Sequence, residues 1–358
     1  MTKQDIEHVY QETSATLKTI SQKRKATLFF QKMMWLLMGM YFVGATLVVL
    51  SAYFPEELKW LSVIANKLLG NTKNPYQQLY YLLPLLILIS INSYFFSGAF
   101  YRFKTLEMNT ISKMIKQLFP QAEFSQTSQI NNNITIESKL FAWIKTNTPI
   151  YTFGQMRTSV NGTYLNIADI GFIENHIGNK LINSSLKIPL LNIPVVIYQY
   201  ILKNIATSKT SDAVCFSFRG MYCWANFNKK LTTRTIVIPN SLTTKLDRFA
   251  SFNFKDEEKI ALEDARFNSH FSVYSPDQIE SRYVLSSSVM EKITTLKERF
   301  NRNIMLSFIN NKVFLAVENP NGIFSFPSGK LDSITIIEEL IAEINTAQSM
   351  VTELKLNR

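Results

Sequence analysis

The densest group of charged side chains that could do chemistry lies between residues 263 and 282. It comprises Glu263, Asp264, Asp277, Glu280 and Arg282. Hard cations prefer carboxylate oxygens as ligands, and an arginine guanidinium binds carboxylate or phosphate through paired hydrogen bonds. The group is therefore a candidate site for a metal ion, a basic ligand or a protein partner.

The spacing of this group also has a structural explanation. Asp264 precedes a predicted helical turn that ends at His270, and Ser275-Pro276-Asp277-Gln278 is a helix-start pattern with Ser275 as the cap and a proline in the first helical position. On this interpretation Asp264 and Asp277 complement helix starts, and Arg282 binds a carboxylate within the fold. We favour it because capping alone accounts for the spacing.

Arg219 is a further candidate, because it lies where the alternation of apolar residues changes. Val214 to Phe218 place apolar side chains on one parity, and Met221 to Phe227 place them on the other. Such a change predicts one inserted residue or a tight reversal at Arg219-Gly220. A glycine bulge is slightly preferred over a hairpin, since Arg-Gly is a poor type I′ pair. Arg219 is then either a ligand-binding arginine or, as we favour, a bulge residue that points to solvent.

Motifs of known chemistry are missing from the sequence. Its three histidines and two cysteines form no His-x-x-x-His or Cys-x-x-Cys pattern, and Gly-x-Ser-x-Gly does not occur. The segment from Gly322 to Lys330 lacks the glycine spacing of a phosphate-binding loop. We therefore expect no catalytic residues, no metal and no cofactor, and the sequence favours a protein that is not an enzyme.

The elements that position these residues are predicted to be strands and helices of an α+β fold with antiparallel sheet. Strand-like runs occur at residues 148–153, 164–173, 195–201, 214–227 and 235–238. The clearest hairpin turns at Asn310-Asn311, and its expected cross-strand pairs are Phe308 with Val313, Leu306 with Leu315, and Ile304 with Val317. A C-terminal helix begins at about Ser333.

Two long uncharged runs precede this fold, from Met33 to Pro55 and from Asn74 to Tyr101. About 20 helical residues cross the hydrocarbon core of a bilayer, so we predict a transmembrane hairpin with an interfacial link. The predicted organisation is a cytosolic amphipathic helix (1–27), the hairpin (28–104), a juxtamembrane helix with a polar linker (105–133) and a cytosolic α+β domain (134–358).

The net charge of +11 supports this topology. Lys and Arg gather before the first run and after the second, while the link between the runs is nearly balanced. Positive residues accumulate on the cytoplasmic side, so both termini are predicted to be cytoplasmic at the inner membrane of a bacterium. The remaining positive charge is scattered without a dense basic run, so we expect no nucleic-acid partner.

Two segments resemble a known protein family. The first is Phe218-Arg219-Gly220-Met221, which continues to Trp224-Ala225-Asn226-Phe227-Asn228-Lys229. The second is Leu262-Glu263-Asp264 with Phe267, which continues from Phe271 to Leu285. With the two uncharged runs, they are similar to a bacterial two-span membrane-protein family known as domain of unknown function three-one-three-seven. Ser281 replaces the small residue, commonly alanine, that the family has there. The resemblance implies an inner-membrane protein and a possible LemA-type membrane partner, and it brings no catalytic residues.

Two functional hypotheses follow from the sequence. The first is an inner-membrane protein whose cytosolic α+β domain binds a protein partner or assembles as a homo-oligomer. The second is a membrane-tethered enzyme or ligand sensor that uses Glu263, Asp277 and Arg282. The first is preferred because no active-site pattern is present.

Overall fold

The computed structural model describes residues 3–53, 59–60, 63, 75–141, 148, 150–172, 217–226, 230–241, 258–326, 331 and 333–353. The chain divides into two compact units. One comprises residues 15–107, and the other comprises residues 1–14 together with 108–358. The predicted strand at residues 195–201 and most of the link between the two uncharged runs lie outside the described residues.

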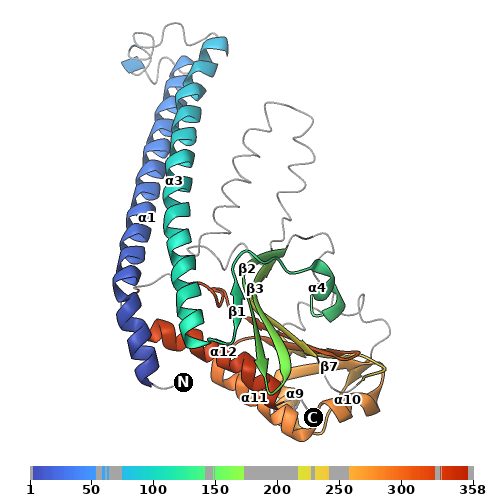
Figure 1. Cartoon of the computed structure of the whole chain (residues 1–358). Helices are drawn as coiled ribbons and strands as arrows, with labels where there is room; N and C mark the ends of the chain where they lie inside the picture. The colour runs from blue at the N-terminus through green and yellow to red at the C-terminus, as the bar shows by residue number, and fades with distance from the viewer. Residues whose placement is uncertain are drawn as a thin grey trace. The chain divides into compact units, whose positions relative to one another are not determined.

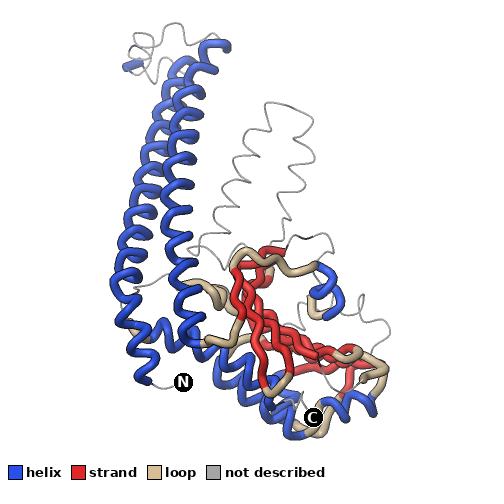
Figure 2. Tube along the Cα trace, viewed as in Figure 1, coloured by secondary structure: helices blue, strands red, loops and turns tan. Residues whose placement is uncertain are grey.

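Two long helices form the N-terminal part of the chain, α1 (Lys3–Tyr53) and α3 (Pro75–Leu118), and they run side by side (Figures 1 and 2). Inside the unit of residues 15–107, the buried side chains of Arg24 and Glu107 join them, with 3.5 Å between Nη2 and Oε2. Lys104 places its Nζ atom 3.6 Å from the same carboxylate oxygen. Helix α3 ends at Leu118, two residues before Pro120, which cannot continue a helix because it lacks a backbone N–H group.

The predicted transmembrane hairpin is wrong. Within the described residues, no helix contains a stretch that is long and apolar enough to cross a membrane. A helix that crosses the hydrocarbon core needs about 20 consecutive, predominantly apolar residues, and the described residues of α1 and α3 contain no stretch that meets this requirement. The expected inner-membrane localisation and orientation rested on the same hairpin and are withdrawn with it.

The second unit contains a large antiparallel sheet, which confirms the predicted α+β class. Its strands within the described residues are, in spatial order, β1 (Glu123–Ser125), β2 (Ile150–Val160), β3 (Thr163–Phe172), β4 (Phe218–Asn226), β9 (Lys312–Glu318), β8 (Ile304–Ile309), β5 (Thr235–Pro239), β7 (Phe271–Ser275) and β6 (Glu258–Ile260). Strand β1 forms within the stretch whose composition predicted a polar linker.

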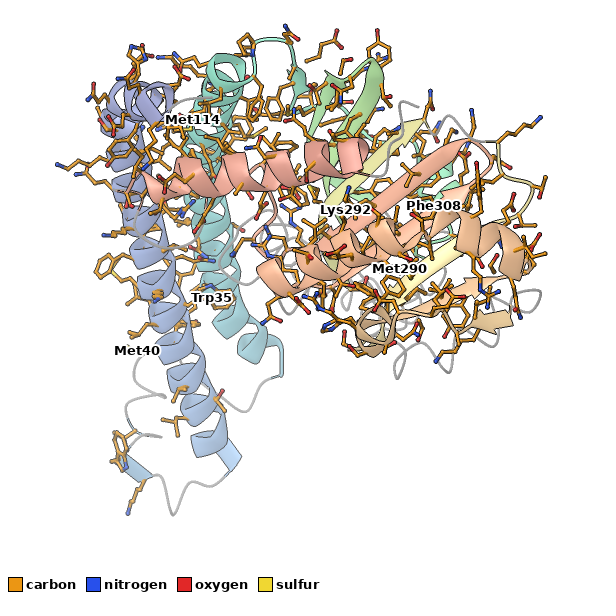
Figure 3. All side chains as sticks on the ribbon, turned by 90° about the horizontal axis from the view of Figure 1, so that it is seen from below. Trp35, Met40, Met114, Met290, Lys292 and Phe308 are labelled. Atoms are coloured by element: carbon orange, nitrogen blue, oxygen red, sulfur yellow. The ribbon has the colours of Figure 1, made fainter. Side chains whose placement is uncertain are left out.

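Helices cover both faces of the sheet. On one face, α4 (Asn132–Ser138) and the adjoining residues pack over a core that includes Phe141, Tyr222 and Phe314. The opposite face carries α11 (Ser287–Phe300) and α12 (Thr335–Glu353), which lie beneath the strands in Figure 1 and in front of them in Figure 3, where the molecule is seen from below. The short helices α9 (Ala265–His270) and α10 (Gln278–Val284) flank strand β7. The C-terminal helix expected from about Ser333 is α12.

The hairpin of β8 and β9 has the predicted register. Phe308 pairs with Val313, Leu306 with Leu315, and Ile304 with Val317. Asn310 adopts a φ of 56° in the turn, a conformation that asparagine tolerates better than most residues. The alternation of apolar and turn residues was thus sufficient to specify this element.

The predicted bulge at Arg219-Gly220 is wrong, because β4 is a continuous strand. It pairs with β3 from Phe218 opposite Phe172 to Ala225 opposite Leu165 without a shift in register. Both faces of β4 are buried, so apolar residues at both parities belong to one regular strand. Gly220 is required for another reason: an added Cβ atom would lie 2.1 Å from the carbonyl oxygen of Val317 on β9.

Candidate functional site

Asp264 begins α9, as the capping pattern predicts. Its Oδ1 atom accepts a hydrogen bond of 3.0 Å from the backbone nitrogen of Phe267. The first backbone N–H groups of a helix have no partner inside the helix, so a carboxylate at this position satisfies one of them. Phe267, fully buried, fixes the short helix against the fold.

Asp277 begins α10 in the same way. Its Oδ1 atom accepts hydrogen bonds from the backbone nitrogens of Ile279 (2.7 Å) and Glu280 (3.2 Å). The predicted cap, Ser275, is instead the last residue of β7, and its Oγ atom accepts a hydrogen bond from the backbone nitrogen of Asp277. The helix therefore starts two residues later than the sequence pattern indicated, because Ser275 is still paired in the sheet.

Glu280 ties α10 to the segment that precedes β5. Its carboxylate accepts hydrogen bonds from the backbone nitrogens of Thr232 (2.8 Å) and Thr233 (2.7 Å), and from both threonine hydroxyls. Burial alone would raise the pKa of the Glu280 carboxyl, but the bonds from Thr233 and Thr232 outweigh it and lower the pKa below its usual value. Glu280 therefore has a structural role, and we call its hydrogen bonds with Thr232 and Thr233 the Glu280 clamp.

Glu263 and Arg282 form the remaining contact of the predicted cluster. The Nε atom of Arg282 lies 3.0 Å from Oε1 of Glu263, and both side chains are exposed. The five residues thus serve two helix starts, one clamp and one surface ion pair, rather than converging on a cavity. Among the described residues, no group of three or more His, Cys, Asp or Glu could hold a metal ion.

Two apolar side chains of α10 remain on its surface. Ile279 is 82% exposed and Tyr283 is 59% exposed. Residues four positions apart lie on the same side of a helix, so the two form one apolar patch. We call these two residues the α10 patch.

Arg219 is buried, contrary to the prediction that it points to solvent. It is 5% exposed, and its Nη2 atom lies 3.1 Å from Oδ2 of Asp169, which is fully buried on the neighbouring strand β3. The guanidinium carbon lies 3.3 Å from the centre of the Phe153 ring. Arg219 and Met221 lie on the same face of β4, and both are buried, so Arg219 pairs inside the core instead of bulging outward.

The turn after β9 covers this buried pair. Oδ2 of Asp169 also accepts hydrogen bonds from the backbone nitrogens of Ile323 and Phe324, each of 3.1 Å. Gly322 has a φ of +70°, and an added Cβ atom would lie 2.4 Å from Nη2 of Arg219. The turn can therefore approach the pair so closely only because residue 322 has no side chain.

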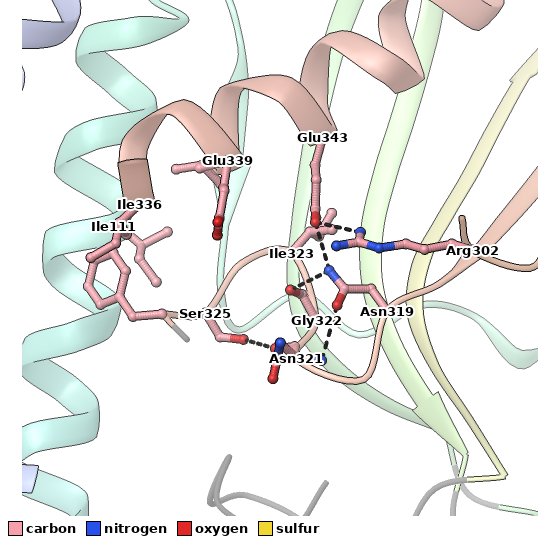
Figure 4. A pocket seen from close by; sticks show the side chains of 12 residues that line it. Ile111, Arg302, Asn319, Asn321, Gly322, Ile323, Ser325, Ile336, Glu339 and Glu343 are labelled. Atoms are coloured by element: carbon pink, nitrogen blue, oxygen red, sulfur yellow. Dashed lines mark hydrogen bonds and ion pairs between the residues drawn. The ribbon is translucent and has the colours of Figure 1, made fainter. Parts of the chain in front are cut away.

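A second carboxylate and arginine extend the network to α12. The Glu343 carboxylate accepts hydrogen bonds from Nη1 of Arg302 (2.6 Å) and Nδ2 of Asn319 (2.8 Å), as Figure 4 shows. Burial raises the pKa of Glu343 above its usual value, and the charge of Asp169 adds to this rise against the opposing effect of Arg302. Asn319 links the Arg302–Glu343 pair to the Asp169–Arg219 pair. Its side chain binds Glu343, and its backbone nitrogen donates a hydrogen bond to the carbonyl oxygen of Arg219.

The pocket beside this network is small. Its volume is about 50 Å³, and Figure 4 shows Ile111 and Ile336 at one end and Arg302 and Glu343 at the other. Pockets for organic ligands are typically about 300–1,000 Å³, so this one is large enough only for a few water molecules. We therefore interpret the network as part of the architecture that joins α12 to the sheet.

Sequence reasoning missed four members of the network: Asp169, Arg302, Asn319 and Glu343. Their partners lie on distant parts of the chain, and Asp169 and Arg219 are separated by 50 positions. The available signal was the run Asn319-Pro320-Asn321-Gly322, whose residue types favour a tight turn. That signal locates the turn but does not reveal what the turn covers.

The C-terminal part of the chain is similar to a known family model. Residues 216–356 match the model of a family described as protein of unknown function (DUF3137). The match supports an uncharacterised domain family over the part of the chain that contains α9 to α12. It does not extend to the two uncharged runs. A comparison with curated proteins found no match.

Among solved structures, the crystal structure of the mycobacterial trehalose monomycolate transport factor A, TtfA, is similar over 69% of this chain and 95% of that chain. The sequence identity is 8% and the TM-score is 0.33. A TM-score of this size is too low to indicate a shared fold.

Proposed function

We propose that the α+β unit is a protein-interaction module that contacts its partner through the α10 patch. The observation that carries this proposal is the exposure of Ile279 and Tyr283 on a helix whose charged residues are engaged elsewhere. Asp277 and Glu280 bind backbone groups of the fold, and Arg282 pairs with Glu263. The apolar pair is what the helix offers to another molecule.

The spacing of the patch fits recognition by a groove. An amphipathic helix binds a hydrophobic groove through apolar anchors at positions such as i and i+4. Tyrosine is enriched among the residues that dominate binding energy at protein interfaces. The partner is therefore a protein that presents an apolar groove, with a polar rim that faces the Glu263–Arg282 pair.

The helix is held in place before binding. The Asp277 cap fixes its start, and the Glu280 carboxylate joins it to Thr232 and Thr233, which precede the buried strand β5. A segment that is ordered in the free protein loses less conformational entropy on binding than a mobile one. This rigidity supports a docking role for a helix of only seven residues.

The rival hypothesis of an enzyme or ligand sensor receives less support. It requires Glu263, Asp277 and Arg282 to direct their polar groups toward one ligand. Asp277 instead binds the backbone of α10, and Glu263 and Arg282 bind each other on the surface. The arrangement explains these residues without a ligand, so protein interaction remains the better proposal.

Photocrosslinking tests the proposal with a matched control. A photoreactive phenylalanine analogue is placed at Tyr283 or at Tyr164, which has nearly the same exposure (58%) but lies on β3. In the native host, position 283 should give a crosslinked partner that the Ile279→Asp variant loses, while its melting temperature stays unchanged. Equal crosslinking from position 164, or no adduct from position 283, would contradict the proposal.

A further inference from the structure

The sequence contains the dipeptide Asn-Gly at two places, Asn161-Gly162 and Asn321-Gly322. Asparagine is one of the chemically labile residues of proteins, because its side-chain amide can react with the peptide nitrogen of the next residue. Glycine in the second position obstructs this reaction least, since it has no Cβ atom and few conformational restrictions. Both dipeptides are therefore open to the reaction by their sequence, and the fold decides which of them reacts.

Asn161 and Gly162 form the two-residue turn between β2 and β3. Their φ angles are 51° and 83°, and Val160 pairs with Thr163 on either side of them. Positive φ angles at both central residues are typical of a type I′ turn. Both residues are exposed, and the backbone nitrogen of Gly162 has no partner in the β2–β3 ladder. Solvent therefore reaches the turn that holds the two reacting groups.

The end of this hairpin extends past the pairing of the neighbouring strands. Within the described residues, β1 pairs with β2 only from Gln155 to Arg157, and β4 pairs with β3 only from Leu165 to Phe172. The last two residue pairs before the turn therefore have no ladder partner outside the hairpin. The ends of a ladder open locally at a low free energy. The turn can thus leave its folded conformation while the rest of the sheet stays paired.

The second dipeptide has different surroundings. Gly322 is buried, and its backbone nitrogen donates a hydrogen bond of 2.9 Å to the carbonyl oxygen of Asn319. Asn321 is exposed, but its backbone nitrogen donates to Oδ1 of Asn319 (3.1 Å), and its carbonyl oxygen accepts a hydrogen bond from Oγ of Ser325 (2.7 Å). Gly322 also lies against the buried carboxylate–arginine pair described above. This turn therefore opens only when several of these contacts break together.

We propose that Asn161 is a site of spontaneous deamidation, with water as the co-reactant. The backbone nitrogen of Gly162 attacks Cγ of Asn161. The new N–Cγ bond forms, the Cγ–Nδ2 bond breaks, and the amide nitrogen leaves as ammonia with the proton from Gly162. The five-membered ring that results takes up one water molecule. Opening of the ring at Cγ gives aspartate, and opening at the main-chain carbonyl carbon of residue 161 gives isoaspartate.

The two products change the hairpin in different ways. Both add a negative charge to an exposed turn. Aspartate fits the same turn, because Asp-Gly also forms type I′ turns. Isoaspartate leads the main chain through its side chain, which adds one carbon atom to the backbone, so the two-residue turn no longer matches the strands. This inference concerns the turn between β2 and β3, so it stands or fails independently of the α10 patch.

Peptide mass spectrometry of the full chain tests the proposal, with Asn321-Gly322 as the matched control. The folded chain is kept at mildly alkaline pH, samples are digested at intervals, and the deamidated fraction at each asparagine is measured. Asn161 should react at least about ten times faster than Asn321, which corresponds to about 1.4 kcal/mol in the free energy of activation. Chromatographic separation of the peptides should show isoaspartate as well as aspartate at position 161, because the ring can open on either side.

The same measurement in concentrated urea removes the contribution of the fold. Once circular dichroism shows that the chain is unfolded, the two dipeptides should react at similar rates, because the same two residues then meet the same solvent. Equal rates in the folded chain would overturn the proposal, as would an Asn161 that reacts only in urea. Aspartate without isoaspartate at position 161 would also overturn it, since that outcome indicates direct hydrolysis of the amide instead of attack by Gly162.

Discussion

Two carboxylate–arginine pairs in the α+β unit have almost the same geometry and different surroundings. Arg282 lies 3.0 Å from Glu263 on the surface, and Arg219 lies 3.1 Å from Asp169 in the core. Solvent screens the first pair, and holding two long side chains together costs entropy, so such pairs contribute about 0–1 kcal/mol. The second pair is shielded from water. Burial, rather than the distance between the charged groups, therefore decides how much stability is lost when either pair is broken.

The two regions also differ in how far their contacts reach. Asp264 and Asp277 bind backbone groups within three positions of themselves, so each contact shapes one short helix. The buried network joins β3 and β4 through Asp169 and Arg219, and Asn319 continues it to Glu343 on α12. The surface cluster can therefore carry a binding patch on its helix, while the network holds separate elements of the fold together.

The largest expected effect is the loss of Arg219. Arg219→Met leaves Asp169 as a buried carboxylate without its guanidinium, and breaking a buried pair costs about 3–5 kcal/mol. Arg282→Met removes the same group from the surface pair and should cost under about 1 kcal/mol. Urea unfolding of both variants measures the free energies. If the two variants lose similar free energies of unfolding, burial does not make the Arg219–Asp169 pair more important for stability than the Arg282–Glu263 pair.

The second prediction tests the turn that covers the buried pair. Gly322→Ala forces an alanine into a φ of +70° and places its Cβ atom against Arg219 and Asp169. We expect a loss of roughly 2–4 kcal/mol, of which about 1–2 kcal/mol comes from the left-handed conformation itself. Gly162→Ala is the matched control, since its φ is +83° and its Cβ atom would meet open space.

Gly162→Ala should therefore lose only the conformational part, again measured by urea unfolding. If both glycine variants lose the same free energy, the close approach of residue 322 to the Asp169–Arg219 pair has no energetic weight, and the turn is held by its backbone conformation alone.

The sequence predicted the parts of this fold that depend on neighbours along the chain. The register of β8 and β9 followed from alternating apolar residues around Asn310-Asn311, and the role of Asp264 followed from its position before α9. The pairing of Asp169 with Arg219 could not be predicted, because it requires knowing that β3 and β4 are adjacent. Alternation was also a poor guide for β4, since a strand buried on both faces has no polar side.

The uncharged runs show a different limit of sequence reasoning. From Met33 and from Asn74 onward, the absence of charge suggested membrane spans, but α1 and α3 do not meet the apolar requirement over the described residues.

The smallest expected effect is a difference in pH dependence between the two regions. The pKa of Glu280 is lowered in the folded state, so its contribution to stability is present above the ordinary carboxyl pKa of about 4.3 and is lost as the pH falls through the lowered value. The pKa of Glu343 is raised by burial, so its contribution is present below the ordinary pKa and is lost as the pH rises through the raised value.

Replacing each residue with glutamine should therefore produce opposite trends. Between about pH 3 and 7, the stability of the native chain relative to Glu280→Gln should increase with pH, by under about 1 kcal/mol because the group lies near the surface. Its stability relative to Glu343→Gln should decrease with pH. Thermal unfolding at several pH values measures both differences. Parallel trends would mean that Arg302 and Asn319 compensate the burial of Glu343 fully, and the contrast between a surface cluster and a buried network would then not extend to protonation.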